Sequence, residues 1–277
     1  MITSKIVSEA IDYIMNHVGE KITIDDVADH CHFSKYYFSR IFKAETGESV
    51  YSFIKRAKME QSAFRLKVDK EKTITDIGYS VGYTPSNYSS VFKQYHDTSP
   101  IEFRKGILDK SLHLDFNHDE TNKLESYEEC KEKITIEILE DINVIYERRI
   151  GNYHDLTLNW CEFLDKYKDY INDETLLIDR TFDDPSITDM DKCVYDVCIS
   201  VKKDCSLENT LVIKGGKYAV YHFKGYIKGI YAAYQSIFTM WLPESRNEID
   251  DRYSFAIYRR IDCETEYMEM DMCIPIK

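Results

Sequence analysis

The feature that most constrains this 277-residue chain is a pattern of short helix, turn and second helix that occurs twice. The first copy begins at Thr23, a residue type that caps helices well. Ser34 is predicted to cap the second helix of this copy, which runs from Lys35 to about Thr46 and ends at Gly47. Two such copies in tandem favour an all-helical N-terminal domain.

The second copy begins at Thr73, and Pro85 stands at the start of its second helix, where the missing N–H costs no hydrogen bond. Between the copies, the apolar spacing predicts a helix from Glu48 to Lys67 with one buried face. At about 1.5 Å per residue this helix spans about 30 Å, close to the ~34 Å repeat of the major groove of B-DNA. The spacer therefore suits a chain that places two recognition helices in adjacent turns of one groove.

The outer faces of the two predicted recognition helices carry polar and cationic side chains. On the first, Phe38, Ile41 and Phe42 form the buried stripe, and the opposite side has three cations and no acid. A solvated face usually mixes both signs, so this composition favours contact with DNA. The expected DNA contacts are Ser34, Lys35, Tyr36, Ser39, Arg40 and Lys43 from the first copy, and Pro85, Ser86, Asn87, Ser90 and Lys93 from the second.

The net charge of the chain is −13, but this charge is unevenly distributed. Residues 1–110 hold 16 Lys and Arg against 15 Asp and Glu, so the rest of the chain carries the acidic excess. A nearly neutral half can still present a basic face, whereas an acidic half is not expected to bind DNA.

From Ile134 onward the pattern changes to short alternating segments, which are typical of half-buried strands. Two predicted helices, at about 154–170 and 227–241, each follow a strand and a glycine and precede two strands. This faint internal repeat predicts an α+β domain of two β-α-β-β units with a ligand cleft between them. We therefore expect domains at 1–108 and 132–277, joined by a polar linker at 109–131.

The N-terminal motifs resemble those of the AraC/XylS family over residues 5–107. They include 34–43 (SKYYFSRIFK), 81–83 (VGY) and 87–93 (NYSSVFK). The resemblance implies a seven-helix domain that binds promoter DNA and usually activates transcription by contacting RNA polymerase. His32 departs from the pattern, because the family often has glycine in that turn.

Residues 132–277 resemble the GyrI-like effector-binding domains, on segments that include 149–153 (RIGNY), 192–199 (KCVYDVCI) and 255–258 (FAIY). The resemblance implies two β-α-β-β units around a cleft, and a ligand that in this family is often bulky, aromatic and cationic. The side chains expected to contact it are Tyr153, Tyr195, Tyr226, Trp241, Ala256 and Tyr258.

Ala256 stands where many GyrI-like relatives have a glutamate that meets the ligand cation. Strand alternation puts Ala256 and Tyr258 on one face and Phe255 on the other. If the first face lines the cleft, its wall is small, aromatic and uncharged, which predicts poor discrimination between a cation and its neutral analogue. The alternative is that another acid compensates; Asp183 and Asp184 are expected to shape a turn instead.

Three functions stay open: a ligand-responsive regulator, a hydrolase of a reactive small molecule, and a protein-binding module. The regulator is favoured because no Ser/His/Asp or metal constellation is evident, so we predict no enzyme activity, catalytic residue, metal or cofactor. The cysteines form no Cys-x-x-Cys pair and are expected as reduced thiols. Because no signal peptide or apolar run of ~18 residues is present, we expect a cytoplasmic protein whose partners are promoter DNA, RNA polymerase and a small effector, with no membrane.

Overall fold

The computed structural model describes residues 1–112, 123–262 and 264–277, which form two compact units. One unit comprises Met1–Lys110 with Asp184–Asp189, and the other comprises Ser111–Asp183 with Met190–Lys277. The predicted linker, 109–131, lies partly outside the described residues. Its described ends are helical, with α7 (Pro100–Leu112) on one side and α8 (Tyr127–Lys133) on the other.

The first unit is helical, as its apolar spacing predicts. Its elements are α1 (Lys5–Asn16), α2 (Ile24–His30), α3 (Lys35–Thr46), α4 (Val50–Val68), α5 (Ile74–Ser80), α6 (Pro85–His96) and α7. The Thr23 side chain accepts a hydrogen bond from the backbone of Asp26 and caps α2, as expected. Ser34 does precede α3, but its side chain makes no capping bond, so that part of the prediction is wrong.

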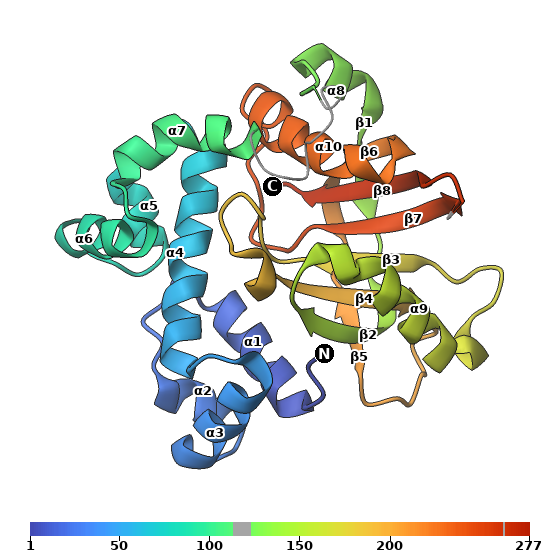
Figure 1. The fold of residues 1–277 in the computed structure, drawn as a ribbon, viewed down its shortest axis with the longest axis horizontal. Helices are drawn as coiled ribbons and strands as arrows, with labels where there is room; N and C mark the ends of the chain where they lie inside the picture. Colours follow the sequence, from blue (N-terminus) through green and yellow to red (C-terminus); the bar gives the residue numbers. More distant parts are fainter. Residues whose placement is uncertain (113–122, 263) are drawn as a thin grey trace. The chain divides into compact units, whose positions relative to one another are not determined.

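Helix α4 is the element that both helix-turn-helix copies share (Figure 1). Towards its N-terminal end, Phe53 meets Phe42 of α3 edge to face, with ring centroids 5.4 Å apart. Towards its C-terminal end, Met59 and Leu66 join a core cluster that includes Phe92 of α6. Because α4 is enclosed by two copies, it buries more than the single predicted stripe. Its buried side chains include Arg56, Lys58 and Glu60.

The second unit is one sheet of eight described strands in the order β1-β6-β8-β7-β3-β4-β2-β5. The strands are β1 (Ile134–Leu139), β2 (Ile142–Ile150), β3 (Leu177–Thr181), β4 (Val194–Ser200), β5 (Thr210–Ile213), β6 (Gly216–Tyr226), β7 (Phe255–Asp262) and β8 (Tyr267–Pro275). All the described pairings are antiparallel.

The two predicted β-α-β-β repeats are present, and the strand order is symmetric about the β3–β7 pair. The first repeat is β2, α9 (Leu156–Lys166), β3 and β4, and the second is β6, α10 (Ile230–Ser236), β7 and β8. A π-helical turn, Ile237–Trp241, follows α10. The α+β prediction for this half is therefore confirmed.

The two faces of the sheet bury different residues. Phe255 and Ile257 of β7 belong to a core cluster with Ile178 of β3. Helix α9 covers the other face (Figure 1). There Phe163 of α9 and Tyr167, which directly follows α9, pack against residues of β2 and β4. The alternation predicted along 255–258 is thus confirmed. No helix in the described ranges has the length and apolar character of a bilayer span.

Two glycines with the same backbone conformation give a matched test of close packing. Gly47 and Gly82 both have φ of 77°, but a Cβ on Gly47 meets nothing within 4 Å, whereas one on Gly82 lies 3.1 Å from the Glu20 carbonyl oxygen. We expect Gly47→Ala to lower the free energy of unfolding by about 1 kcal/mol, because an L residue is strained at this φ. Gly82→Ala should cost at least about 2 kcal/mol, since a neighbouring backbone must also shift. Urea denaturation of both variants measures the difference, and equal losses would contradict the packing argument.

Candidate DNA interface and effector site

The side chains predicted to read DNA from the first copy lie on the solvent side of α3. Ser34, Lys35, Arg40 and Lys43 are exposed, Ser39 is half-buried, and Tyr36 is 82% exposed. The opposite side of the helix is anchored, because the side chains of Phe38 and Phe42 are fully buried. Such a helix presents a cationic and aromatic face on a rigid support, as contact with a groove requires.

One cation of this face already has a partner. The ammonium of Lys35 lies 2.7 Å from a carboxylate oxygen of Asp25 on α2, and both side chains are more than half exposed. A pair this exposed contributes little to stability, so a DNA phosphate can compete for Lys35 at small cost. Arg40 has its guanidinium 5.9 Å from the ring centre of Tyr37.

The second copy has the same design with fewer charges. Ser86, Asn87, Ser90 and Lys93 are exposed on α6, and Pro85 is half-buried at its first turn. The turns of the two copies also correspond. His32 has φ of 61° and Gly82, at the same place in the second turn, has φ of 77°, so this position demands a left-handed backbone whichever residue occupies it.

In the second unit, a buried carboxylate lies at the centre of the sheet face that carries α9. Asp179 on β3 pairs directly with Ala256 on β7, and its carboxylate Oδ2 accepts a 2.7 Å hydrogen bond from the hydroxyl of Tyr258. Aromatic side chains from α9, α10 and the loop before α9 surround this pair. We call Asp179, Tyr153, Trp160, Tyr234 and Tyr258 the Asp179 cluster.

Ring contacts hold the cluster together. The indole of Trp160 meets the ring of Tyr258 edge to face, with centroids 5.5 Å apart. Tyr153 packs on Tyr195, with centroids 5.1 Å apart, and the hydroxyl of Tyr195 accepts a 2.6 Å bond from Asn159. Within the described residues, the buried hydroxyl of Tyr153, Nε1 of Trp160 and Oδ1 of Asp179 have no hydrogen-bond partner. Three polar atoms of the cluster thus lack a partner among these residues.

Asp179 carries the cluster's only ionisable charge near neutral pH. Burial raises the pKa of Asp179 to about 6, and the Tyr258 hydroxyl and the backbone N–H of Ala256 oppose that rise. Burial also raises the pKa values of Tyr153, Tyr234 and Tyr258 well above 10, so these tyrosines remain neutral. In the described part of the chain, no Lys, Arg or His side chain pairs with Asp179.

Two other buried carboxylates of the sheet show the contrast. Asp196 accepts bonds from Arg148 at 2.8 Å and from Arg180 at 3.0 Å. Glu147, in the same cross-strand row as Asp179, pairs with Arg149 at 2.9 Å and with Lys166. A buried anion without such partners is costly, so the Asp179 cluster is complementary to a cation with apolar or aromatic surface.

The structure groups some of the predicted ligand contacts and separates others. Tyr153, Ala256 and Tyr258 lie at Asp179, and Tyr195 packs beside them. Tyr226 is 54% exposed at the end of β6, where it meets Tyr267, and Trp241 is buried at the end of the π-helical turn. Within the described residues, neither Tyr226 nor Trp241 makes a ring contact or a hydrogen bond with the cluster.

Sequence reasoning missed Asp179, Trp160 and Tyr234. The available signal was an aspartate in the middle of the short strand LIDRT at 177–181, where Asp179 and the preceding Ile178 are both buried. The expectation of an uncharged wall around Ala256 is wrong, because the neighbouring strand supplies a carboxylate there. Asp184 does shape a turn, as predicted, since it accepts a 2.8 Å bond from the backbone of Ser186. Asp183 instead accepts a 2.6 Å bond from the backbone of Val194, eleven residues away.

Two family models match the chain. A GyrI-like small molecule binding domain matches residues 132–277, and a helix-turn-helix domain matches residues 27–106. Over 101 residues, the chain is 30% identical to the regulatory protein SoxS of Escherichia coli, covering 36% of this chain and 94% of SoxS.

Two further relatives are longer than SoxS. The xylose operon regulatory protein of Escherichia coli is 35% identical over 104 residues, 37% of this chain and 26% of that protein. The regulatory protein PocR of Salmonella typhimurium is 31% identical over 104 residues, 37% of this chain and 34% of that protein. The chain thus spans about a quarter to a third of these two relatives. From these matches, the chain belongs to the GyrI-like small-molecule-binding family and carries an AraC-type helix-turn-helix DNA-binding domain.

Proposed function

We propose that this chain is a ligand-responsive transcription regulator that reads promoter DNA through α3 and α6 and binds an organic cation at the Asp179 cluster. Domains at 1–108 and 132–277, activation through contact with RNA polymerase, and a cytoplasmic location are parts of the same proposal. The coarser function, DNA binding with a small-molecule-binding domain, rests on the two family matches.

The observation that carries the choice of effector is the unpaired burial of Asp179. Asp179 is 6% exposed and lies among aromatic rings, and one of its carboxylate oxygens has no hydrogen-bond partner in the described residues. Each aromatic face attracts a cation by about 0.5–2 kcal/mol, and the carboxylate adds a charge-assisted bond of about 1.5–3 kcal/mol. A neutral ligand gains neither contribution in full.

The same carboxylate favours hydrolysis as a second candidate function. A carboxyl group with a pKa near 6 exchanges its proton close to neutrality, as a general acid or base must. The regulator remains our first choice because the DNA-binding domain lies in the same chain.

The first prediction separates base reading from phosphate contact on α3. We expect Arg40→Ala to weaken binding to a duplex selected by the wild-type protein by about 1–3 kcal/mol and to relax one base position. Lys43→Ala should weaken all duplexes alike and reduce the salt dependence. Binding titrations against single-base variants of the selected duplex measure both effects. If the Arg40 variant kept the full base preference of the wild type, its role as a reader would be rejected.

The second prediction tests the charge of the effector. We expect the wild type to prefer crystal violet, an aromatic cation, over its uncharged leuco form. Asp179→Asn should lose roughly tenfold to a hundredfold in affinity for the cation and little for the neutral dye. Fluorescence or calorimetric titration of both dyes gives the four affinities.

Two control variants sharpen this test. Glu147→Gln removes a carboxylate that already has cationic partners, so it should not change the ratio of the two dye affinities. Asp179→Asn combined with Ala256→Glu returns a carboxylate to the adjacent position and should restore the cation preference. A wild-type protein that binds both dyes equally would disprove the proposed effector class, and recovery of chemically altered dye would favour hydrolysis.

The third prediction concerns stability and pH. The pKa of Asp179 is about 6 in the folded chain, against an ordinary value of 3.8. Protonation of Asp179 therefore adds to the free energy of unfolding in full below pH 3.8, and this contribution is lost as the pH rises through 6. Asp179→Asn should therefore be more stable than the wild type at pH 7, by on the order of 2–3 kcal/mol, and by much less at pH 4. Urea denaturation of both proteins at the two pH values measures this change. A difference that is constant with pH would show that Asp179 has an ordinary pKa.

A further inference from the structure

A single buried lysine connects the two helix-turn-helix copies. Lys58 lies near the middle of α4 and is 6% exposed. Its ammonium donates hydrogen bonds to the backbone carbonyl oxygens of Val18 at 2.5 Å, Glu20 at 2.6 Å and Val81 at 3.0 Å. All three N–H donors of the ammonium are therefore in use.

The three carbonyl groups come from both copies. Val18 and Glu20 lie in the connection that leads from α1 into α2 of the first copy, and Val81 directly follows α5 of the second. The backbones also approach each other closely there. A Cβ on Gly19 would lie 3.0 Å from the carbonyl oxygen of Ser80, and one on Gly82 would lie 3.1 Å from that of Glu20.

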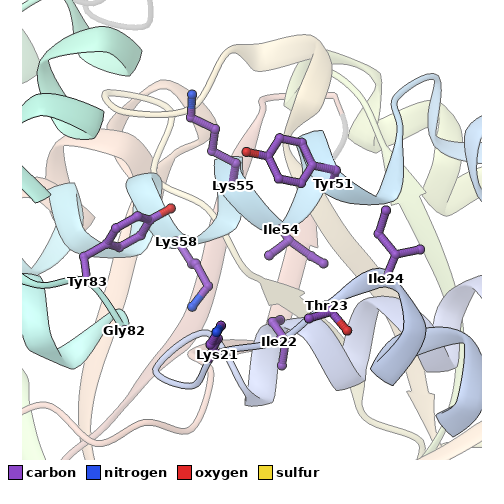
Figure 2. Close-up of a pocket in the computed structure, with 10 residues that line it drawn as sticks. All are labelled: Lys21, Ile22, Thr23, Ile24, Tyr51, Ile54, Lys55, Lys58, Gly82 and Tyr83. Atoms are coloured by element: carbon purple, nitrogen blue, oxygen red, sulfur yellow. The ribbon is translucent and has the colours of Figure 1, made fainter. Parts of the chain in front are cut away.

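Beside Lys58 the two copies do not pack tightly. A pocket of about 190 Å³ lies there. Figure 2 shows the Lys58 side chain directed between the segment that holds Lys21 and the turn that holds Gly82. The other residues that line the pocket are Ile22, Thr23, Ile24, Tyr51, Ile54, Lys55 and Tyr83. Besides α4, the bonds of Lys58 and the close backbone contacts at Gly19 and Gly82 therefore hold the angle between the copies.

We infer that Lys58 is a positioning residue that sets the relative orientation of α3 and α6, and with it the ability of one chain to engage two half-sites on one duplex. This rests on the proposed reading of DNA by both helices. Burial lowers the pKa of Lys58 to about 8, against the effect of the Glu20 carboxylate, so the ammonium is still mainly charged at pH 7.

The chemistry of the junction explains why a lysine suits it. Three carbonyl oxygens converge on one point, and a compact ammonium with three donors satisfies them together. A planar guanidinium spreads its donors in a fork and cannot direct three of them to one point. Methionine has similar length and no donor, so it leaves the three carbonyl groups of the junction without this partner.

The test uses the full chain and a duplex selected from a random pool by the wild type. A footprint first defines two half-sites about 10 bp apart, and each is then scrambled in turn to give single-site duplexes. We expect Lys58→Met to lose at least tenfold in affinity for the two-site duplex and to stay within twofold of the wild type on each single-site duplex. The variant should also discriminate less against duplexes with one or two added base pairs between the half-sites.

Matched variants separate positioning from loss of fold. Lys21→Met, which removes another ammonium from the lining of the same pocket, should leave the two-site to single-site ratio unchanged. Lys58→Arg should recover part of the two-site affinity, and Gly19→Ala, which crowds the same junction without touching Lys58, should lower it. Should Lys58→Met fail to fold, these two variants still decide the matter.

The possible outcomes are distinct. If Lys58→Arg and Gly19→Ala lost equal affinity for two-site and single-site duplexes, the inference would be overturned. A wild-type footprint confined to one face of the groove would also overturn it, although the protein would still bind DNA. Failure of the wild type to select any duplex would instead reject the proposed function.

Discussion

Antiparallel pairing of β3 with β7 is the interaction on which the second unit depends. It joins the two β-α-β-β repeats into one sheet and brings Asp179 opposite Ala256. A slip of one residue would turn Asp179 to the other face of the sheet, into the cluster that holds Phe255 and Ile257. The register therefore decides whether the proposed effector site contains a charge at all.

The buried ionic groups of this sheet divide into two kinds. Glu147 and Asp196 have arginine partners, so their desolvation is offset by charge-assisted bonds. Asp179 has the Tyr258 hydroxyl and backbone N–H groups beside it but no cationic partner in the described residues, and the folded chain therefore retains a destabilised carboxylate at neutral pH. Sites that bind ligands commonly hold such groups, because a ligand that supplies the missing partner recovers the lost free energy.

The first unit solves a different problem with related means. Its two copies need a defined spacing, yet each buries its own apolar side chains against a separate part of α4. The hydrogen bonds of Lys58 then join segments on both sides of α4. Such a junction is directional, because hydrogen bonds to three carbonyl groups specify an angle in a way that apolar contact does not.

The sequence by itself determined the elements and their order. Gly47 after α3, Pro85 in the first turn of α6 and the apolar periodicity of both helices indicate the bounds of α3 and α6, and the alternating segments and repeat glycines indicate the two β-α-β-β units. These signals are local, since they depend on residues within about one or two turns of each other. The exposed faces of α3 and α6 could be predicted for the same reason.

Only the tertiary structure decided what meets across the chain. Asp179 and Ala256 are far apart in sequence, and nothing near either residue specifies the strand register that pairs them. Likewise, an interior lysine on a helix ordinarily suggests a solvated side chain, and only the convergence of three distant carbonyl groups explains the burial of Lys58. A charge takes its role from partners that long-range packing supplies, and local sequence patterns do not encode those partners.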